Sequence, residues 1–104
     1  MRLFRKRKRE TDVARAVGQA VGQPVDYNHL QYGAGALSGV VDAAGRERYA
    51  ELLRAAYAAL REELGEDADR VVFYLSAVTP EGTSLDAASI GLPVQPTGAD
   101  VARL

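Results

Sequence analysis

The chain has 104 residues, of which 47% are hydrophobic and 26% charged, and it contains no cysteine. This length supports one domain with a modest core, and the composition excludes a collagen-like or wholly disordered chain. The lack of cysteine excludes disulfides, thiolate chemistry and cysteine-ligated zinc or iron–sulfur clusters. No stretch approaches the roughly 20 apolar residues that a membrane helix needs.

Charge is distributed unevenly along the chain. Residues 1–9 contain six basic residues and no acid: Arg2, Arg5, Lys6, Arg7, Lys8 and Arg9. All fourteen acidic residues follow them, so the rest of the chain has a net charge of −7. A run of like charges repels itself and is usually disordered on its own. We therefore expect a basic flexible arm over residues 1–10, attached to one acidic domain over residues 11–92. Because no apolar stretch follows the basic start, we expect a cytoplasmic protein without a secretion signal.

Residues 11–22 are predicted to form a short helix. Apolar side chains recur on one helical face at Val13, Val17, Ala20 and Val21. Thr11 or Asp12 can cap the N-terminus, and Gly22 fits the C-terminal end.

Residues 23–41 give weaker signals. Residues 25–32 alternate loosely between polar and apolar side chains, and residues 36–41 fit a short strand. The glycines at 33, 35 and 39 are similar to a phosphate-binding loop, but their spacing fails because Ser38 occupies the position of the third glycine. A flexible connector is the better interpretation.

Residues 43–64 are predicted to form the longest helix. An apolar stripe of helical period runs through Tyr49, Leu52, Leu53, Ala56, Tyr57, Leu60 and Leu64. Asp42 fits an N-cap, and Gly65 fits the position just past the C-terminus. Buried tyrosine hydroxyls need partners, so we expect Tyr49 and Tyr57 at the edge of the core, where a second subunit or ligand meets them.

Residues 70–79 are predicted to form the clearest strand. Its alternate residues are largely apolar on both faces, which is typical of a central strand covered on both sides. One long helix covers only one face of a sheet. The other face, with Tyr74, must then be covered by residues 11–22 or by another chain.

The remaining segments are short. Residues 79–82 fit a turn, and residues 83–90 fit either a return strand or a short helix, with the hairpin slightly favoured. Residues 93–104 are expected to form an irregular C-terminal tail, with at most one helical turn at 99–104. Together these elements predict an α+β fold, with one long helix packed on a small antiparallel sheet and a shorter N-terminal helix.

Little in the sequence favours catalysis. His29 is the only histidine and lies near Asp26, which suits a general base, but no motif frames a nucleophile. A small enzyme using these two residues is the weakest of three hypotheses. We expect no cofactor, no metal and no small-molecule ligand.

The favoured hypothesis is a non-enzymatic protein–protein interaction module: an adaptor, a regulator or an immunity-type inhibitor. It acts through its folded surface on a protein partner or on itself as a homo-oligomer, with Tyr49, Tyr57 and Tyr74 at the interface. The alternative is an accessory binder of nucleic acid or anionic membranes that acts through Arg2, Arg5, Lys6, Arg7, Lys8 and Arg9.

Overall fold

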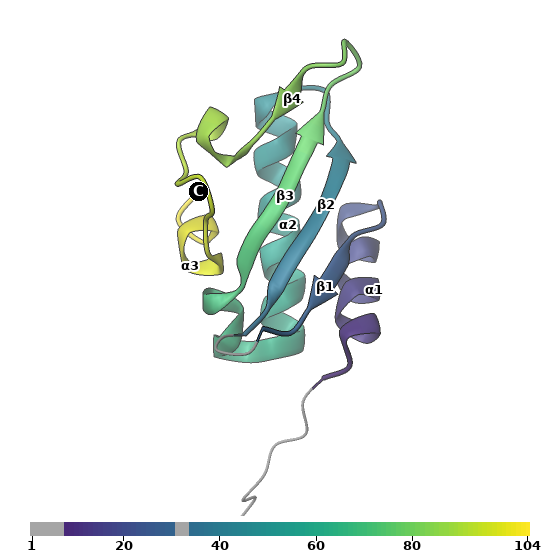
Figure 1. The fold of residues 1–104 in the computed structure, drawn as a ribbon, viewed down its shortest axis with the longest axis vertical. Coiled ribbons are helices and arrows are strands. Elements are labelled where there is room, and N and C mark those ends of the chain that lie inside the picture. Colours follow the sequence, from purple (N-terminus) through teal and green to yellow (C-terminus); the bar gives the residue numbers. More distant parts are fainter. Residues whose placement is uncertain (1–7, 31–33) are drawn as a thin grey trace, which may run out of the picture.

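Two helices lie on one side of a four-stranded sheet in the computed structural model, which describes residues 8–30 and 34–104 (Figure 1). In sheet order the strands are β1 (Asp26–Asn28), β2 (Ala36–Asp42), β3 (Val72–Val78) and β4 (Ser84–Leu85). The helices are α1 (Glu10–Val21), α2 (Arg46–Leu64) and α3 (Gly98–Val101). Two 3₁₀ segments complete the fold, η1 (Gly65–Arg70) and η2 (Ala87–Ile90). The predicted α+β class is confirmed.

The sheet is mixed, which corrects the antiparallel sheet expected from the sequence. β1 pairs with β2, and β3 with β4, in antiparallel fashion, but β2 and β3 run parallel along seven residue pairs. The physical reason is the connection between them. A tight hairpin reverses the chain, whereas α2 carries the chain back to the starting end of β2, so that β3 leaves in the same direction.

Both predicted helices are confirmed, but they begin differently from the expectation. The N-cap of α1 is Arg9 and that of α2 is Gly45, and neither makes a side-chain cap hydrogen bond. Asp42 instead ends β2. At the other end of α1, Gly22 adopts a left-handed conformation with φ 73°, which glycine reaches without a steric penalty. Packing rather than capping therefore holds these helices in place.

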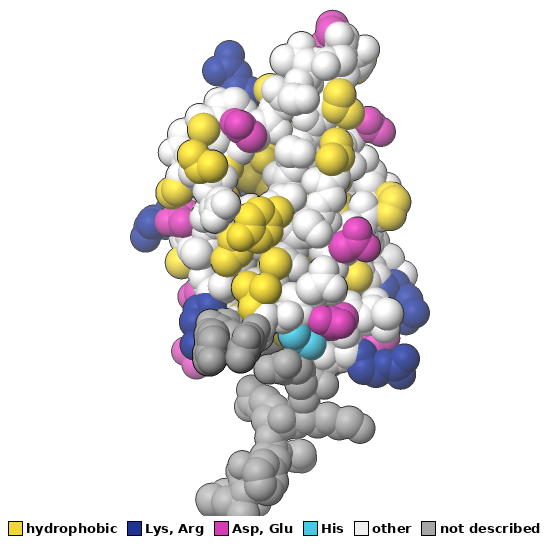
Figure 2. Space-filling view, viewed as in Figure 1, with side chains coloured by type: hydrophobic (Ala, Val, Ile, Leu, Met, Phe, Trp, Pro, Cys, Tyr) yellow, Lys and Arg dark blue, Asp and Glu magenta, His cyan; other side chains and the backbone are white. Residues whose placement is uncertain are grey.

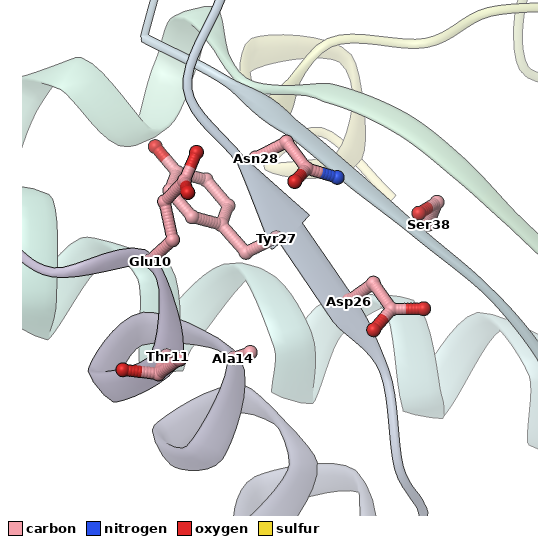
Figure 3. A pocket seen from close by; sticks show the side chains of 7 residues that line it. All are labelled: Glu10, Thr11, Ala14, Asp26, Tyr27, Asn28 and Ser38. Carbon is pink, nitrogen blue, oxygen red and sulfur yellow. The ribbon is translucent and has the colours of Figure 1, made fainter.

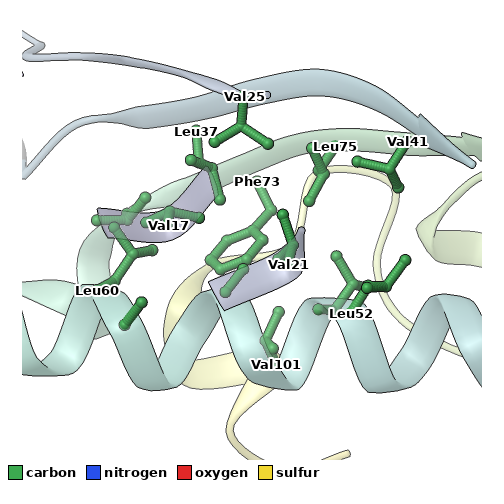
Figure 4. Packing of buried hydrophobic residues seen from close by; sticks show 14 of the residues in the cluster. Val17, Val21, Val25, Leu37, Val41, Leu52, Leu60, Phe73, Leu75 and Val101 are labelled. Carbon is green, nitrogen blue, oxygen red and sulfur yellow. The ribbon is translucent and has the colours of Figure 1, made fainter. Parts of the chain in front are cut away.

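The core lies between the sheet and the two helices. Leu37 and Val41 of β2 and Phe73 and Leu75 of β3 point toward α2, as Figure 4 shows. The stripe on α2 meets them with the buried side chains Tyr49, Leu52, Leu53, Ala56, Ala59 and Leu60. α1 adds Val13, Val17 and Val21 beside α2. Among residues 8–30 and 34–104 no polar or charged residue is buried, and the buried hydrophobic residues except Ala87 form one cluster that includes side chains of both helices.

The segment after β3 combines both structures proposed for residues 83–90. Val78 pairs with Ser84 and Ala77 with Leu85 in a short hairpin, and η2 follows at once. Asp86 caps η2 by accepting a hydrogen bond from the Ser89 backbone N–H. The strand ends after two residues because this cap redirects the backbone.

The helical turn allowed at 99–104 is present as α3, but the rest of residues 93–104 is more ordered than the irregular tail expected. The Pro96 carbonyl accepts from the Phe73 N–H at 2.8 Å, and the Gly98 N–H donates to the Val71 carbonyl at 2.8 Å. Thr97 and Asp100 form a reciprocal capping box at the start of α3. Val101 is fully buried in the core cluster. This segment therefore belongs to the packed domain.

Candidate functional site

In the part of the chain that the structure describes, no helix covers one face of the sheet, and we call it the open face. Its side chains alternate with the core residues of the strands and are Asp26, Asn28, Ala36, Ser38, Val40, Asp42, Val72, Tyr74, Ser76 and Val78. Val40 is 67% exposed and Tyr74 is 48% exposed. The expectation that β3 is covered on both sides is therefore wrong within this chain, because α1 packs beside α2 rather than across the sheet.

Strand register places the apolar and acidic groups of the open face. Asp26 lies opposite Ser38, and Ser38 lies opposite Tyr74, so these three form one row across the sheet. Further along, Asp42 lies opposite Val78. The apolar side chains thus lie on the two central strands, at Val40 of β2 and Tyr74 of β3 among others, while the carboxylates lie on β1 and at the far end of β2.

The charged side chains of the four strands on the open face are all acidic. None of the four described strands contains a lysine or arginine, whereas Asp26 and Asp42 are both exposed on this face. Figure 2 views the face directly: apolar side chains gather along its middle, carboxylates lie around them, and Lys and Arg side chains lie near the outline. The surface therefore combines an apolar centre with negative charge.

The sheet edges beside the open face are partly protected. β1 pairs only with residues 36–38 of β2. At the other end of β2, the Gln23 side chain hydrogen-bonds to the strand backbone instead. Its amide accepts from the Asp42 N–H at 2.6 Å and donates to the Asp42 carbonyl at 2.9 Å. At the opposite edge, residues 96–98 bond to the beginning of β3. Added strands would compete with these bonds, which makes the face the better docking surface.

A pocket of about 300 Å³ lies between α1 and β1, at the margin of the open face (Figure 3). Its lining is formed by Glu10, Thr11, Ala14, Asp26, Tyr27, Asn28 and Ser38. The Tyr27 hydroxyl donates to the Ala34 carbonyl at 2.5 Å. Three of the lining side chains, Asp26, Asn28 and Ser38, also belong to the open face, so the pocket extends that surface around the β1 edge.

The three tyrosines predicted at an interface lie in different environments. Tyr49 is fully buried, and its hydroxyl donates to the Leu75 carbonyl at 2.5 Å. Burial, helped by the charge of Asp86, raises the pKa of Tyr49 to about 12. Its side chain offers no surface to a partner. Only Tyr74 projects from the open face.

Tyr57 is half-buried and joins α2 to η1. Its hydroxyl donates to Asp69 Oδ1 at 2.5 Å, and this hydrogen bond, ahead of burial and the charge of Asp69, raises the pKa of Tyr57. The acidic residues Glu66, Asp67 and Asp69 after α2 lie in η1, and Asp69 is the one that Tyr57 bonds. Sequence alone gave no sign of either tyrosine's partner, because both partners come from other elements.

Only the end of the basic arm falls within the described residues. Arg2, Arg5, Lys6 and Arg7 lie outside them. Lys8 Nζ is 3.6 Å from Glu63, and Arg9 Nε is 3.9 Å from Asp12. The Lys8 carbonyl lies 2.8 Å from His29 Nε2, which must donate because a carbonyl only accepts. The described end of the arm is thus held against acidic and polar groups of the domain.

His29 contacts α1, Tyr27 and the end of the arm. Its backbone N–H donates to Glu10 Oε2 at 2.5 Å, and its ring packs edge-on against Tyr27 at 5.2 Å between centroids. In the described part of the chain, no hydrogen bond or ion pair joins His29 to Asp26. Nor do residues 8–30 and 34–104 contain a group of three or more His, Cys, Asp or Glu that could hold a metal ion.

Comparison with protein-family models, curated proteins and solved structures finds no match to this chain. Within the described ranges, no helix has the length and apolar character needed to cross a membrane.

Proposed function

We propose that this chain is a non-enzymatic protein–protein interaction module that binds through the open face of its sheet, as an adaptor, a regulator or an immunity-type inhibitor. The observation that supports this most is the exposure of Val40 and Tyr74 in the middle of a sheet face. The sheet is already stabilised from its other side, so this face is available to a partner. The expected cytoplasmic location is part of the same proposal.

The composition of the open face suits protein recognition. Tyrosine is enriched at the centres of interfaces, where its ring buries a large area and its hydroxyl finds a partner. Around Tyr74 lie the small polar side chains Ser38 and Ser76, with Asp26 and Asp42 further out. An apolar centre inside a polar margin is the usual arrangement of a non-obligate interface.

The arm-based alternative has less support in the folded part of the chain. Lys8 and Arg9, the described members of the arm, are already paired with the acidic groups Glu63 and Asp12. The four strands add no basic residue that would extend a phosphate-binding surface.

Quantitative capture of partners from a lysate of the source cells tests the proposal, with sedimentation of the pure protein to detect self-association. The informative variant is Val40→Ser with Tyr74→Ser, which removes the apolar centre. Val94→Ser is the matched control, because Val94 is 79% exposed but lies outside the sheet. We expect the double variant to bind at least about tenfold more weakly, since truncated anchor residues each cost on the order of 1–2 kcal/mol.

Two results would contradict the proposal. One is equal binding by the double variant and the wild-type chain. The other is a pure protein that sediments as a compact monomer and retains no partner. Circular dichroism and thermal melting of each variant show that a loss of binding is not a loss of folding.

A further inference from the structure

The open face has the chemistry to receive a cationic segment that carries apolar anchors. Its centre carries the exposed apolar side chains Val40 and Tyr74, and the charges on it are the carboxylates Asp26 and Asp42. A partner with the opposite charge gains attraction to these carboxylates and avoids like-charge contact. This inference rests on the proposed function, because it asks what that same face binds.

The chain itself contains a segment with the required chemistry. Residues 1–7 lie outside the described residues, and their sequence places Leu3 and Phe4 among four basic side chains. We propose that this segment binds the open face of its own chain. Leu3 and Phe4 cover the apolar surface of β3 around Tyr74, and the basic side chains approach the carboxylates of β1 and β2.

The point where this segment begins makes the contact reachable. Lys8 is held at the end of β1, by its carbonyl at His29 and by its ammonium at Glu63. The neighbouring row of the sheet runs from Asn28 through Ala36 to Val72, two strand spacings or about 10 Å away. Four extended residues span about 13 Å, so Phe4 can reach β3 from Lys8.

A second copy of the whole domain fits the same face less well. Two open faces packed against each other would bring Asp26 and Asp42 of one copy toward the same carboxylates of the other, and the described strands supply no cation to place between them. The arm supplies those cations. A partner of the module must then displace the arm, so the arm sets how strongly a partner has to bind.

The lack of cysteine in the natural chain allows a direct test by disulfide trapping. The reporting variant is Arg5→Cys with Ser38→Cys, which keeps Leu3 and Phe4 and places a thiol beside Tyr74. The matched control is Arg5→Cys with Ala58→Cys. Ala58 is exposed on α2, the helix whose Glu63 pairs with Lys8, so this thiol lies on the helix layer rather than on the open face. The full chain is oxidised with oxidised glutathione, and monomeric disulfide is measured by non-reducing electrophoresis and mass spectrometry.

We expect the reporting pair to close at least about tenfold faster than the control pair, and to do so within monomers. Raising the salt toward 1 M should remove most of this advantage, because the Debye length falls to about 3 Å. Adding Leu3→Ser and Phe4→Ser should remove it as well.

Equal closure rates for the two pairs would overturn the proposal, and so would disulfide-linked dimers as the main product, because the arm would then bind another copy. The trapping experiment uses pure protein and needs no partner. If the reporting pair fails to close while Val40→Ser with Tyr74→Ser still loses a partner, the interaction module stands and the arm contact falls.

Discussion

The two faces of the sheet are built from neighbouring residues of the same strands, yet they have opposite environments. On β3, Phe73 is 2% exposed under the helices, and Tyr74, the next residue, is 48% exposed. Both are large aromatic side chains in a largely apolar strand. The residue types of a strand therefore indicate how much free energy each side chain would gain from burial. They do not indicate whether another element packs on that face.

The difference between the faces follows from where α1 packs. After Gly22 the chain turns directly into β1, which lies at the sheet edge beside β2. α1 therefore lies next to α2 and contributes Val13, Val17 and Val21 to the same core. With both long helices on one layer, nothing in the described part of the chain crosses the opposite face.

The largest expected effect comes from truncating the same kind of side chain on each face. Phe73→Ala should lower the free energy of unfolding by about 3–5 kcal/mol, because it leaves a cavity in the core. In a chain that also carries Leu3→Ser and Phe4→Ser, Tyr74→Ala should change it by less than about 1 kcal/mol, because the domain alone leaves the ring half in solvent. Urea denaturation measures both. Similar losses in the two variants, with the arm anchors removed, would mean that another copy buries the open face in solution.

Residues 96–98, which bond to the edge of β3, contain a glycine that is tightly packed. A Cβ added at Gly98 would lie 1.9 Å from the Ala68 carbonyl oxygen, so Gly98→Ala must displace backbone. We expect a loss of about 2–3 kcal/mol in urea denaturation, in the range of overpacked cores.

Gly45→Ala is the matched control for this variant, because an added Cβ there meets nothing within 4 Å and the backbone is extended. If Gly98→Ala were as stable as Gly45→Ala, the C-terminal segment would not be packed against η1 as described.

The smallest effect, and the most specific, is expected at the hydrogen bond that joins α2 to the backbone of β3. Tyr49→Phe removes the hydroxyl bonded to the Leu75 carbonyl and should cost about 1–2 kcal/mol at neutral pH. The double variant with Tyr57→Phe tests whether the two tyrosines act independently.

Stability at alkaline pH separates this bond from simple packing. The pKa of Tyr49 is raised from 10.0 to about 12 in the folded state, so the unfolded chain loses the proton first. Wild-type stability should therefore be fully present below pH 10 and fall between pH 10 and 12, by about 1.4 kcal/mol per pH unit from this group. Tyr49→Phe should show a shallower decline. An identical decline in both proteins would show that Tyr49 does not titrate with folding.

The sequence predicted the local elements well and the pairing poorly. The α2 stripe and the apolar alternation of β3 are local patterns, and both elements form where they were expected. The parallel pairing of β2 with β3 depends on contacts between residues far apart in the chain, and so does the β3 edge contact from residues 96–98. The spacing of apolar residues within one element does not indicate such long-range contacts.

The candidate site shows the same division. Tyr49, Tyr57 and Tyr74 were equivalent as sequence candidates, and the fold distinguished them. Tyr49 is in the core, Tyr57 bonds Asp69, and Tyr74 faces outward. The alternation of β3 indicated that Tyr74 and Phe73 point in opposite directions. The position of the two helices decided which of these two sheet faces is buried.

By itself the sequence determined the charge arrangement, with an arm that contains six basic residues before an acidic domain, and the helix and strand periods that make an α+β domain. These follow from composition and from side-chain spacing, which are properties of the chain alone. The tertiary structure decided that both helices share one layer, that the sheet is mixed, and that an apolar, acidic face is left open. These features depend on which elements pack against one another, and that packing is set by the apolar surface that all the helices and strands bury together.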